Sequence, residues 1–158
     1  ENMIILGIDP GTAITGYGII EKNGDILKMI KYGCIKTTKD HSSAERLYQI
    51  DQQLTKLIRQ YKPKQVAIED IFFFKNLKTA IKVSQARGVI LAQAARMKIP
   101  VFEYTPLQIK QAVTGYGRAD KSQVQKMVKL ILSLKEIPKP DDAADALAAA
   151  ICCAHSIR

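Results

Sequence analysis

The sequence contains few of the residues that build disulfide-bonded, membrane-spanning or aromatic-rich proteins. Among its 158 residues are three cysteines, no tryptophan and 6% aromatic residues. Cys152 and Cys153 are adjacent, which is a poor arrangement for a disulfide framework, so we expect a reducing compartment. No apolar run approaches the roughly 18 residues of a membrane span. The run from Met3 to Ile8 is too short for a secretion signal. These absences predict a cytoplasmic protein without a membrane span.

Acidic residues are also scarce. Fifteen Asp and Glu residues stand against 24 Lys and Arg residues, which gives a net charge of +9. Such an excess favours a polyanionic partner, because each neutralised phosphate releases counterions, although many basic proteins bind no nucleic acid. The length and the 47% hydrophobic content indicate a single globular domain over residues 3–158. Glu1 and Asn2 precede Met3 and are expected to be a remnant of expression.

The hydrophobic pattern indicates a mixed α/β protein. Short apolar runs predict strands at 3–8, 14–21, 25–37, 65–71 and 101–104. Helical spacing predicts helices at 43–61, 77–97, about 106–113, 120–134 and 141–156. An Asn-Gly pair at Asn23 is typical of a hairpin, so the first three strands should form an antiparallel meander. Alternating helices and strands then predict a mixed sheet with helices on its faces.

Four acidic residues stand at the ends of these elements. Asp9 and Glu69 follow apolar strands, in GIDPG and VAIED, where an ionised carboxylate is costly unless it is paired or binds metal. Asp142 and Asp145 are three residues apart at a helix start and therefore share one face. The four could converge at one edge of the sheet if the last helix packs there. Oxygen-only ligands suit Mg²⁺ or Mn²⁺ rather than zinc, and two such ions can promote phosphodiester hydrolysis.

Each acid also has a simpler interpretation. Asp9 could start a turn before its Pro-Gly pair, and Glu69 could be a surface acid at a strand end. Asp142 could favour the helix dipole, with Asp141 as the N-cap. Asp145 is harder to dismiss, because it lies within AADALAAAI on a face that otherwise looks buried. Only the set of four favours a metal site.

Several stretches resemble the RuvC family of Holliday junction resolvases, within the ribonuclease H-like superfamily. They are GIDPGTAITGYGII (7–20), AIEDIFF (67–73), KVSQARGV (82–89), FEYTPLQIKQAVTGYGRADKSQVQ (102–125) and DDAADALAAAICCAH (141–155). They keep the family's order and span nearly the whole chain. The resemblance implies a ribonuclease H-like fold with a five-stranded mixed sheet, three antiparallel strands then two parallel ones, flanked by helices. It places the family's catalytic, metal-binding acids on Asp9, Glu69, Asp142 and Asp145.

The resemblance also implies an activity and partners. Members of the family act as homodimers on four-way DNA junctions in homologous recombination and DNA repair. Their paired, symmetric nicks leave 5′-phosphate and 3′-hydroxyl ends. These enzymes use Mg²⁺, which Mn²⁺ is expected to replace, with two ions expected per site. They act in the bacterial cytoplasm at the nucleoid, with a junction-binding protein and a branch-migration ATPase (RuvA and RuvB). Many members carry a further tail after the last helix. The given sequence stops at Arg158, and this departure from the family bears only on the contacts that such a tail makes.

Basic and aromatic residues near these motifs are candidate DNA contacts. They are Lys110, Arg118, Lys121, Phe72, Phe73, Phe74 and Lys75. Lys110 and Lys121 match family lysines near the scissile phosphate, and Phe72 matches the family's base-contacting phenylalanine most closely. An aromatic ring there could stack on an unpaired base at the junction centre. Without the resemblance, the basic residues would be interpreted as solvated surface charges and the aromatic residues as possible core.

The predicted helix at 77–97 is a candidate dimer interface. Its small residues, which permit close approach of a partner helix, are Ala80, Ala86, Gly88, Ala92, Ala94 and Ala95. Its larger apolar residues, more than one buried face requires, are Ile81, Val89, Ile90, Leu91 and Met97. Intramolecular packing could account for all of them. A homodimer, however, would match the two-fold symmetry of a junction.

Other functions stay open from the residues alone. Asp9 with GTAITGYG resembles the first phosphate loop of sugar kinases and actin-like ATPases, but the sequence has no second glycine-rich adenosine loop and no Walker A motif. A junction-binding module with a degenerate site is disfavoured by the intact acid set. A related, shorter family of putative resolvases is disfavoured by the DAADALAAAICCAH ending and the FF segment. A zinc site at Cys152, Cys153 and His155 is not expected, because adjacent residues on a helix diverge.

Overall fold

The computed structural model describes residues 1–70 and 76–157. The elements follow one another as β1 (Met3–Asp9), β2 (Ile14–Asn23), β3 (Ile26–Lys36), α1 (Ser43–Tyr61), β4 (Gln65–Glu69), α2 (Leu77–Arg96), β5 (Val101–Tyr104), α3 (Pro106–Thr114), α4 (Lys121–Ile131) and α5 (Asp141–Ser156). The five strands form one sheet in the order β3-β2-β1-β4-β5. The first three strands pair antiparallel, whereas β4 pairs parallel with β1 and β5 pairs parallel with β4. The predicted mixed sheet is therefore confirmed.

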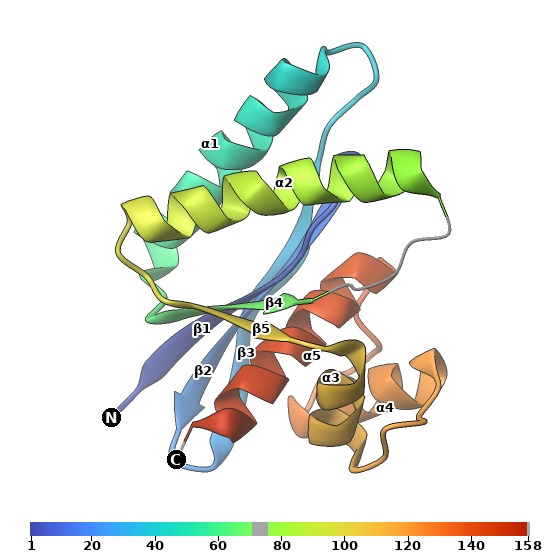
Figure 1. Ribbon diagram of the computed structural model, residues 1–158. Coiled ribbons are helices and arrows are strands. Elements are labelled where there is room, and N and C mark those ends of the chain that lie inside the picture. Colours follow the sequence, from blue (N-terminus) through green and yellow to red (C-terminus); the bar gives the residue numbers. More distant parts are fainter. Residues whose placement is uncertain (71–75, 158) are drawn as a thin grey trace.

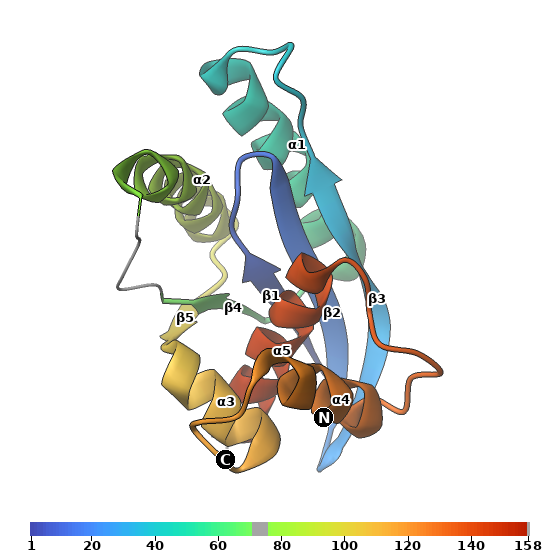
Figure 2. The same ribbon diagram turned by 90° about the vertical axis from the view of Figure 1, so that its right-hand side faces the viewer.

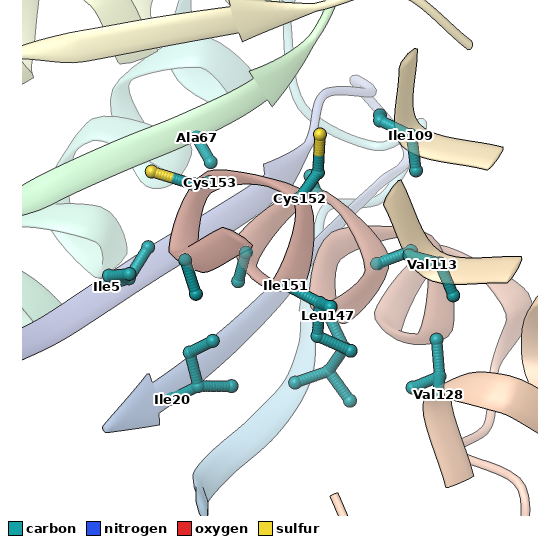
Figure 3. Packing of buried hydrophobic residues seen from close by; sticks show 14 of the residues in the cluster. Ile5, Ile20, Ala67, Ile109, Val113, Val128, Leu147, Ile151, Cys152 and Cys153 are labelled. Atoms are coloured by element: carbon teal, nitrogen blue, oxygen red, sulfur yellow. The ribbon is translucent and has the colours of Figure 1, made fainter. Parts of the chain in front are cut away.

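Helices cover both faces of the sheet (Figures 1 and 2). On one face α1 and α2 bury a cluster that includes Leu6 of β1 and Ile90 of α2. On the other face α5 lies against the sheet, with α3 and α4 beside it. Figure 3 shows Leu147 and Ile151 of α5 lying near Ile20 of β2 in this second core. None of the helices in the described ranges combines the length and hydropathy needed to cross a bilayer.

Strand alternation decides which side chains face α5. Along β1, Leu6 and Ile8 belong to the core under α1 and α2, and Ile5 belongs to the core under α5. Since successive side chains point to opposite faces, Gly7 and Asp9 lie on the α5 face with Ile5. By the same alternation in β4, Glu69 lies on the α5 face with Ala67.

Glycines in β1 and β2 allow the backbone of α5 to approach the sheet closely. A Cβ atom on Gly7 would lie 1.9 Å from the carbonyl oxygen of Ala146, and one on Gly16 would lie 2.0 Å from that of Asp142. Gly16 is also the residue opposite Asp9 in the β1–β2 register. The missing side chains set the depth of α5 on the sheet, and so the position of its first turn next to Asp9.

Several predicted boundaries differ from the structure, by one to three residues. The helix predicted at 120–134 ends as α4 at Ile131, because Ser133 adopts a left-handed conformation with φ 53° that terminates it. The strand predicted at 65–71 ends at Glu69, and its last predicted residue lies outside the described ranges. The hairpin is confirmed, but Asn23 pairs with Ile26, so the two residues of the turn are Gly24, with φ 60°, and the aspartate after it.

Candidate active site

The structure brings the four predicted acids to one edge of the sheet. Asp9 ends β1 and Glu69 ends β4, and these are neighbouring parallel strands. The carboxyl ends of parallel neighbours lie at the same edge, and both side chains are on the α5 face. Asp142 and Asp145 lie in the first two turns of α5, and the backbone of Asp142 packs directly over Gly16.

Burial and neighbouring charges raise the pKa values of Asp9, Glu69 and Asp145. Burial, then the charges of Asp145, Asp142 and Glu69, raise the pKa of Asp9 to about 8, and a hydrogen bond with the Asp142 carboxyl acts in the same direction. Burial and the charge of Asp145 also raise the pKa of Glu69. Burial is the main cause that raises the pKa of Asp145. A cation bound among these groups would reverse this effect.

A hollow of about 260 Å³ lies beside the acids. Its charged lining consists of Glu69, Asp145, Lys110 of α3 and Lys121 of α4, and the rest is Pro106, Ile109, Val124 and Ala148. The charges of Lys110 and Lys121 counteract the raised pKa of Glu69. The Nζ atom of Lys121 lies 3.8 Å from Oδ2 of Asp145. The hollow thus has the mixed charge that a phosphate and its counter-ions would require.

Asp141 differs from its predicted role as N-cap of the last helix. The N-cap is Pro140, which makes no side-chain capping bond, and Asp141 is the first residue of α5. Its carboxylate accepts a hydrogen bond from Gln125 at 3.1 Å and lies 3.1 Å from Nζ of Lys121. The hydrogen bond from Lys121 is the main cause that lowers the pKa of Asp141. This acid therefore ties α4 to α5 instead of capping the helix.

The donor chemistry of the site fits a hard divalent cation. Four carboxylates with no nitrogen or sulfur ligand are what Mg²⁺ or Mn²⁺ takes, and burial together with the neighbouring acids raises the pKa values of Asp9, Glu69 and Asp145. Across residues 1–70 and 76–157, however, no three acidic, histidine or cysteine side chains already converge at ligand distance from one point. The fit thus rests on the donor set and its electrostatics, and ligation requires the side chains to turn inward.

The remaining candidates lie apart from this hollow or outside the described ranges. Arg118 is exposed in the loop between α3 and α4. Phe72, Phe73, Phe74 and Lys75 lie outside the described residues.

The cysteine and histidine side chains near the end of α5 point to different partners. Cys153 donates to Oε1 of Gln65 at 3.0 Å, whereas Nδ1 of His155 is 3.0 Å from the carbonyl oxygen of Ala112. These two side chains therefore face different neighbours, as the divergence of residues along a helix requires.

Sequence reasoning missed two features that shape the site. The close-packing glycines could have been recognised, because glycine inside a strand often marks a close backbone approach. Arg87 of α2, whose Nη1 donates to the carbonyl oxygen of Glu69 at 2.8 Å, gave no local signal because its partner lies 18 residues away.

The family profile described as crossover junction endodeoxyribonuclease RuvC matches residues 5–153. The chain belongs to the RuvC family. RuvC of Heliobacterium modesticaldum is 58% identical over 155 residues, which are 98% of this chain and 96% of that relative. The solved structure of Thermus thermophilus RuvC has a TM-score of 0.89 at 36% identity, covering 97% of this chain and 94% of that one. RuvC of T. thermophilus in complex with Holliday junction substrate has a TM-score of 0.91 at 36% identity, covering 95% and 92%.

Membership of the RuvC family confirms the expected family and the ribonuclease H-like fold. The chain is a metal-dependent DNA endonuclease of the class that resolves Holliday junctions. The kinase and non-catalytic interpretations are thereby set aside.

Proposed function

We propose that this RuvC chain cuts four-way junctions at the site formed by Asp9, Glu69, Asp142 and Asp145, with two Mg²⁺ ions per site that Mn²⁺ can replace. The observation that carries the proposal is the gathering of these carboxylates at the ends of β1 and β4 and the start of α5. Bare carboxylates in this arrangement would repel a phosphate, whereas cations among them would attract it. When bound, the ions supply an activated water and stabilise the leaving oxygen.

The protein's own groups then determine where the phosphate lies. Lys110 and Lys121 line the hollow with Glu69 and Asp145, so the scissile phosphate would lie between the lysines and the acids. Water attacks the phosphorus atom and the bond to the 3′ oxygen breaks, which leaves a 5′-phosphate and a 3′-hydroxyl. We assign further DNA contacts to Arg118 and to residues 72–75, with Phe72 stacking on a base at the junction centre.

The proposed working unit is a homodimer that nicks two opposed strands. On α2, Leu77 is 77% exposed and Ile81 is 50% exposed, on the side opposite the buried Ala86 and Ile90. Of the small residues expected at this interface, Gly88, Ala92 and Ala95 are exposed, Ala80 is half-buried, and Ala86 and Ala94 belong to the protomer's own core. A shallow apolar stripe of this kind suits a two-fold contact with a second copy.

The proposed setting follows from the family resemblance. It is homologous recombination and DNA repair at the bacterial nucleoid in the cytoplasm. RuvA and RuvB would present the junction and move its branch point.

Cleavage of a synthetic immobile four-way junction tests the site. Asp9→Asn, Glu69→Gln, Asp142→Asn and Asp145→Asn should each slow cutting by at least about 100-fold, because each removes a group that holds the cations. Junction binding should persist, since affinity comes from the basic surface. Asp40→Asn, an exposed acid in the loop before α1, is the matched control.

Metal identity is tested in the same assay. Mg²⁺ and Mn²⁺ should support cutting, whereas Ca²⁺ should support binding only, because its looser coordination misplaces water and phosphate. Turnover at the wild-type rate in any one acid variant would remove that residue from the site. Efficient cutting in Ca²⁺ alone would contradict the two-ion assignment.

A further inference from the structure

Arg87 connects three elements that meet around Glu69. It lies in α2, and its guanidinium reaches the carboxyl-terminal ends of β4 and β5. Nη1 donates to the backbone carbonyl of Glu69 at 2.8 Å. Nη2 donates to the carboxylate of Glu103 and lies 3.6 Å from Oδ1 of Asp70. A single side chain thus links α2 to the backbone of a proposed metal ligand, to the acid that follows it in the chain and to an acid of β5.

These contacts fall where the pairing of β4 with β5 ends. The last paired residues are Glu69 and Tyr104, and the amide of Asp70 donates to the carbonyl of Tyr104 at 2.7 Å. The direction of the Glu69 side chain depends on the backbone at this strand end. Arg87 lies on the face of the sheet that α1 and α2 cover, whereas the side chain of Glu69 lies on the opposite face, under α5. The hydrogen bond from Arg87 therefore restrains the backbone of Glu69 from behind its carboxylate.

The chemistry of the guanidinium suits this role. Its nitrogens are held in one plane, so fixing Nη2 on Glu103 also fixes the direction in which Nη1 points. The Arg87 side chain is 19% exposed, against 45% for Glu103 and 34% for Asp70, so it is the least accessible member of the group. Lysine could preserve the charge but could not donate in two fixed directions.

The contacts of Arg87 are not needed to dock α2. Ala86, Ile90 and Ala94 on the same helix are 0%, 0% and 1% exposed and pack into the core against the sheet. A partly exposed ion pair adds little to the stability of a helix that is already anchored in this way. The consequence of the Arg87 contacts is therefore local to the end of β4.

We propose that Arg87 is a positioning residue that acts through the backbone of Glu69 to hold its carboxylate in place for metal binding, without touching metal or DNA itself. This inference rests on the proposed role of Glu69 as a metal ligand. Partners behind metal ligands typically change metal affinity or activity by about 10- to 100-fold when they are removed. Loss of Arg87 should therefore appear first as a changed metal requirement.

The test compares Arg87→Ala, Arg87→Lys and Glu103→Gln in the full chain. Arg96→Ala is the matched control, because Arg96 lies on the same helix and lies 3.9 Å from an acid, Asp51, of α1. Single-turnover cleavage of an immobile four-way junction is measured against Mg²⁺ concentration. Junction affinity in Ca²⁺ and thermal melting are measured on the same preparations.

Arg87→Ala should raise the Mg²⁺ concentration for half-maximal cleavage by about 10-fold or more, with recovery at high Mg²⁺. Its junction Kd should stay within about 3-fold of wild type. Arg87→Lys and Glu103→Gln should show smaller shifts, because each retains part of the network. A Mg²⁺ dependence equal to that of Arg96→Ala would overturn the inference, and so would a loss of cleavage matched by equal losses of binding and melting temperature.

Two further results keep the test decisive. If Arg87→Ala does not fold, Arg87→Lys decides: a shifted Mg²⁺ dependence at the wild-type melting temperature supports positioning, and an unshifted one overturns it. Wild type and Glu69→Gln are run in parallel. A wild type that leaves junctions uncut, or an active Glu69→Gln, would reject the proposed function itself. Inactive Glu69→Gln beside an unaffected Arg87→Ala rejects only the role of Arg87.

Discussion

When no metal is bound, the ionised form of the Asp9 carboxyl group destabilises the folded protein. Its pKa of about 8, against an ordinary 3.8, means that the folded state binds the proton more tightly than the unfolded state does. The stability that this group contributes is complete below pH 3.8 and is lost as the pH rises through about 8. Metal-free protein should therefore lose stability as the pH rises over this range.

Asp9→Asn removes the charge, and we expect it to stabilise the metal-free protein near pH 8 while abolishing cleavage. A gain of about 1–2 kcal/mol, typical of replacing a strained functional group, corresponds to a rise in Tm of roughly 2–8 °C. Melting in EDTA should depend less on pH for the variant than for wild type, and Mg²⁺ should stabilise wild type more. Asp40→Asn controls for the loss of one exposed acid. A variant that melts below wild type at that pH would show that the Asp9 charge is not destabilising.

Lys121 lies between two acids of α5 and the hollow. Burial opposes its charge, but the hydrogen bond to Asp141 and the charges of Asp145, Asp141 and Asp142 outweigh burial and raise the pKa of Lys121. Lys121→Ala should slow cutting by about 10-fold or more, since it removes a cation from the proposed position of the scissile phosphate. Junction affinity should fall much less, because one phosphate contact among many is lost. Lys126→Ala, also exposed on α4, is the control. A larger loss of affinity than of rate would place Lys121 in DNA binding only.

At the scale of elements, the depth of α5 on the sheet decides whether its acids reach Asp9. A methyl group on Gly16 would lie 2.0 Å from the carbonyl oxygen of Asp142, so the first turn of α5 must move away in Gly16→Ala. We expect a loss of about 1–3 kcal/mol in unfolding free energy, typical of overpacking. Cleavage should fall further than the unfolded fraction explains. Ala13→Val, in the exposed turn after β1, adds bulk without such a contact. Wild-type cleavage by Gly16→Ala would show that the start of α5 can shift freely.

Much of this arrangement could be predicted from the sequence, because the spacing of apolar residues indicates which side of a helix or strand is buried. The strands carrying Asp9 and Glu69 and the helix carrying Asp142 and Asp145 were all predicted, although the strands were predicted to end at residues 8 and 71. What failed depended on single backbone conformations or distant partners. Ser133 takes a left-handed conformation that few non-glycine residues adopt, and so ends α4 early. Asp141 forms an ion pair with Lys121 of another helix instead of capping α5, and a local capping pattern gives no information about such a distant partner.

At the scale of the whole molecule, the described part of one chain gathers a single set of four acids, whereas resolving a junction takes two nicks. Composition could not separate a core role of α2 from the proposed interface role, because alanine and isoleucine occur in both. The structure shows which residues serve the core: Ala86, Ile90 and Ala94 are buried, whereas Leu77 and Ile81 are exposed. An exposed apolar side chain in the second turn of α2, Ile81, is therefore a position at which the proposed dimer can be tested without disturbing the core.

Ile81→Lys should weaken the proposed dimer while preserving attraction to DNA. In a two-fold contact the substitution occurs twice, so two like charges are added to the interface and apolar contact is lost. The dimer dissociation constant should therefore rise at least about 10-fold. Sedimentation at micromolar concentration should show about twice the monomer mass for wild type and a lower mass for the variant. On a supercoiled cruciform plasmid, wild type should give linear product directly, and the variant should accumulate nicked circles.

Ile26→Lys, at a 72% exposed position of the hairpin, adds the same charge elsewhere and should behave as wild type. A wild-type chain that stays monomeric on and off DNA, or an Ile81→Lys variant that still makes paired nicks as a dimer, would place the interface elsewhere than on this face of α2.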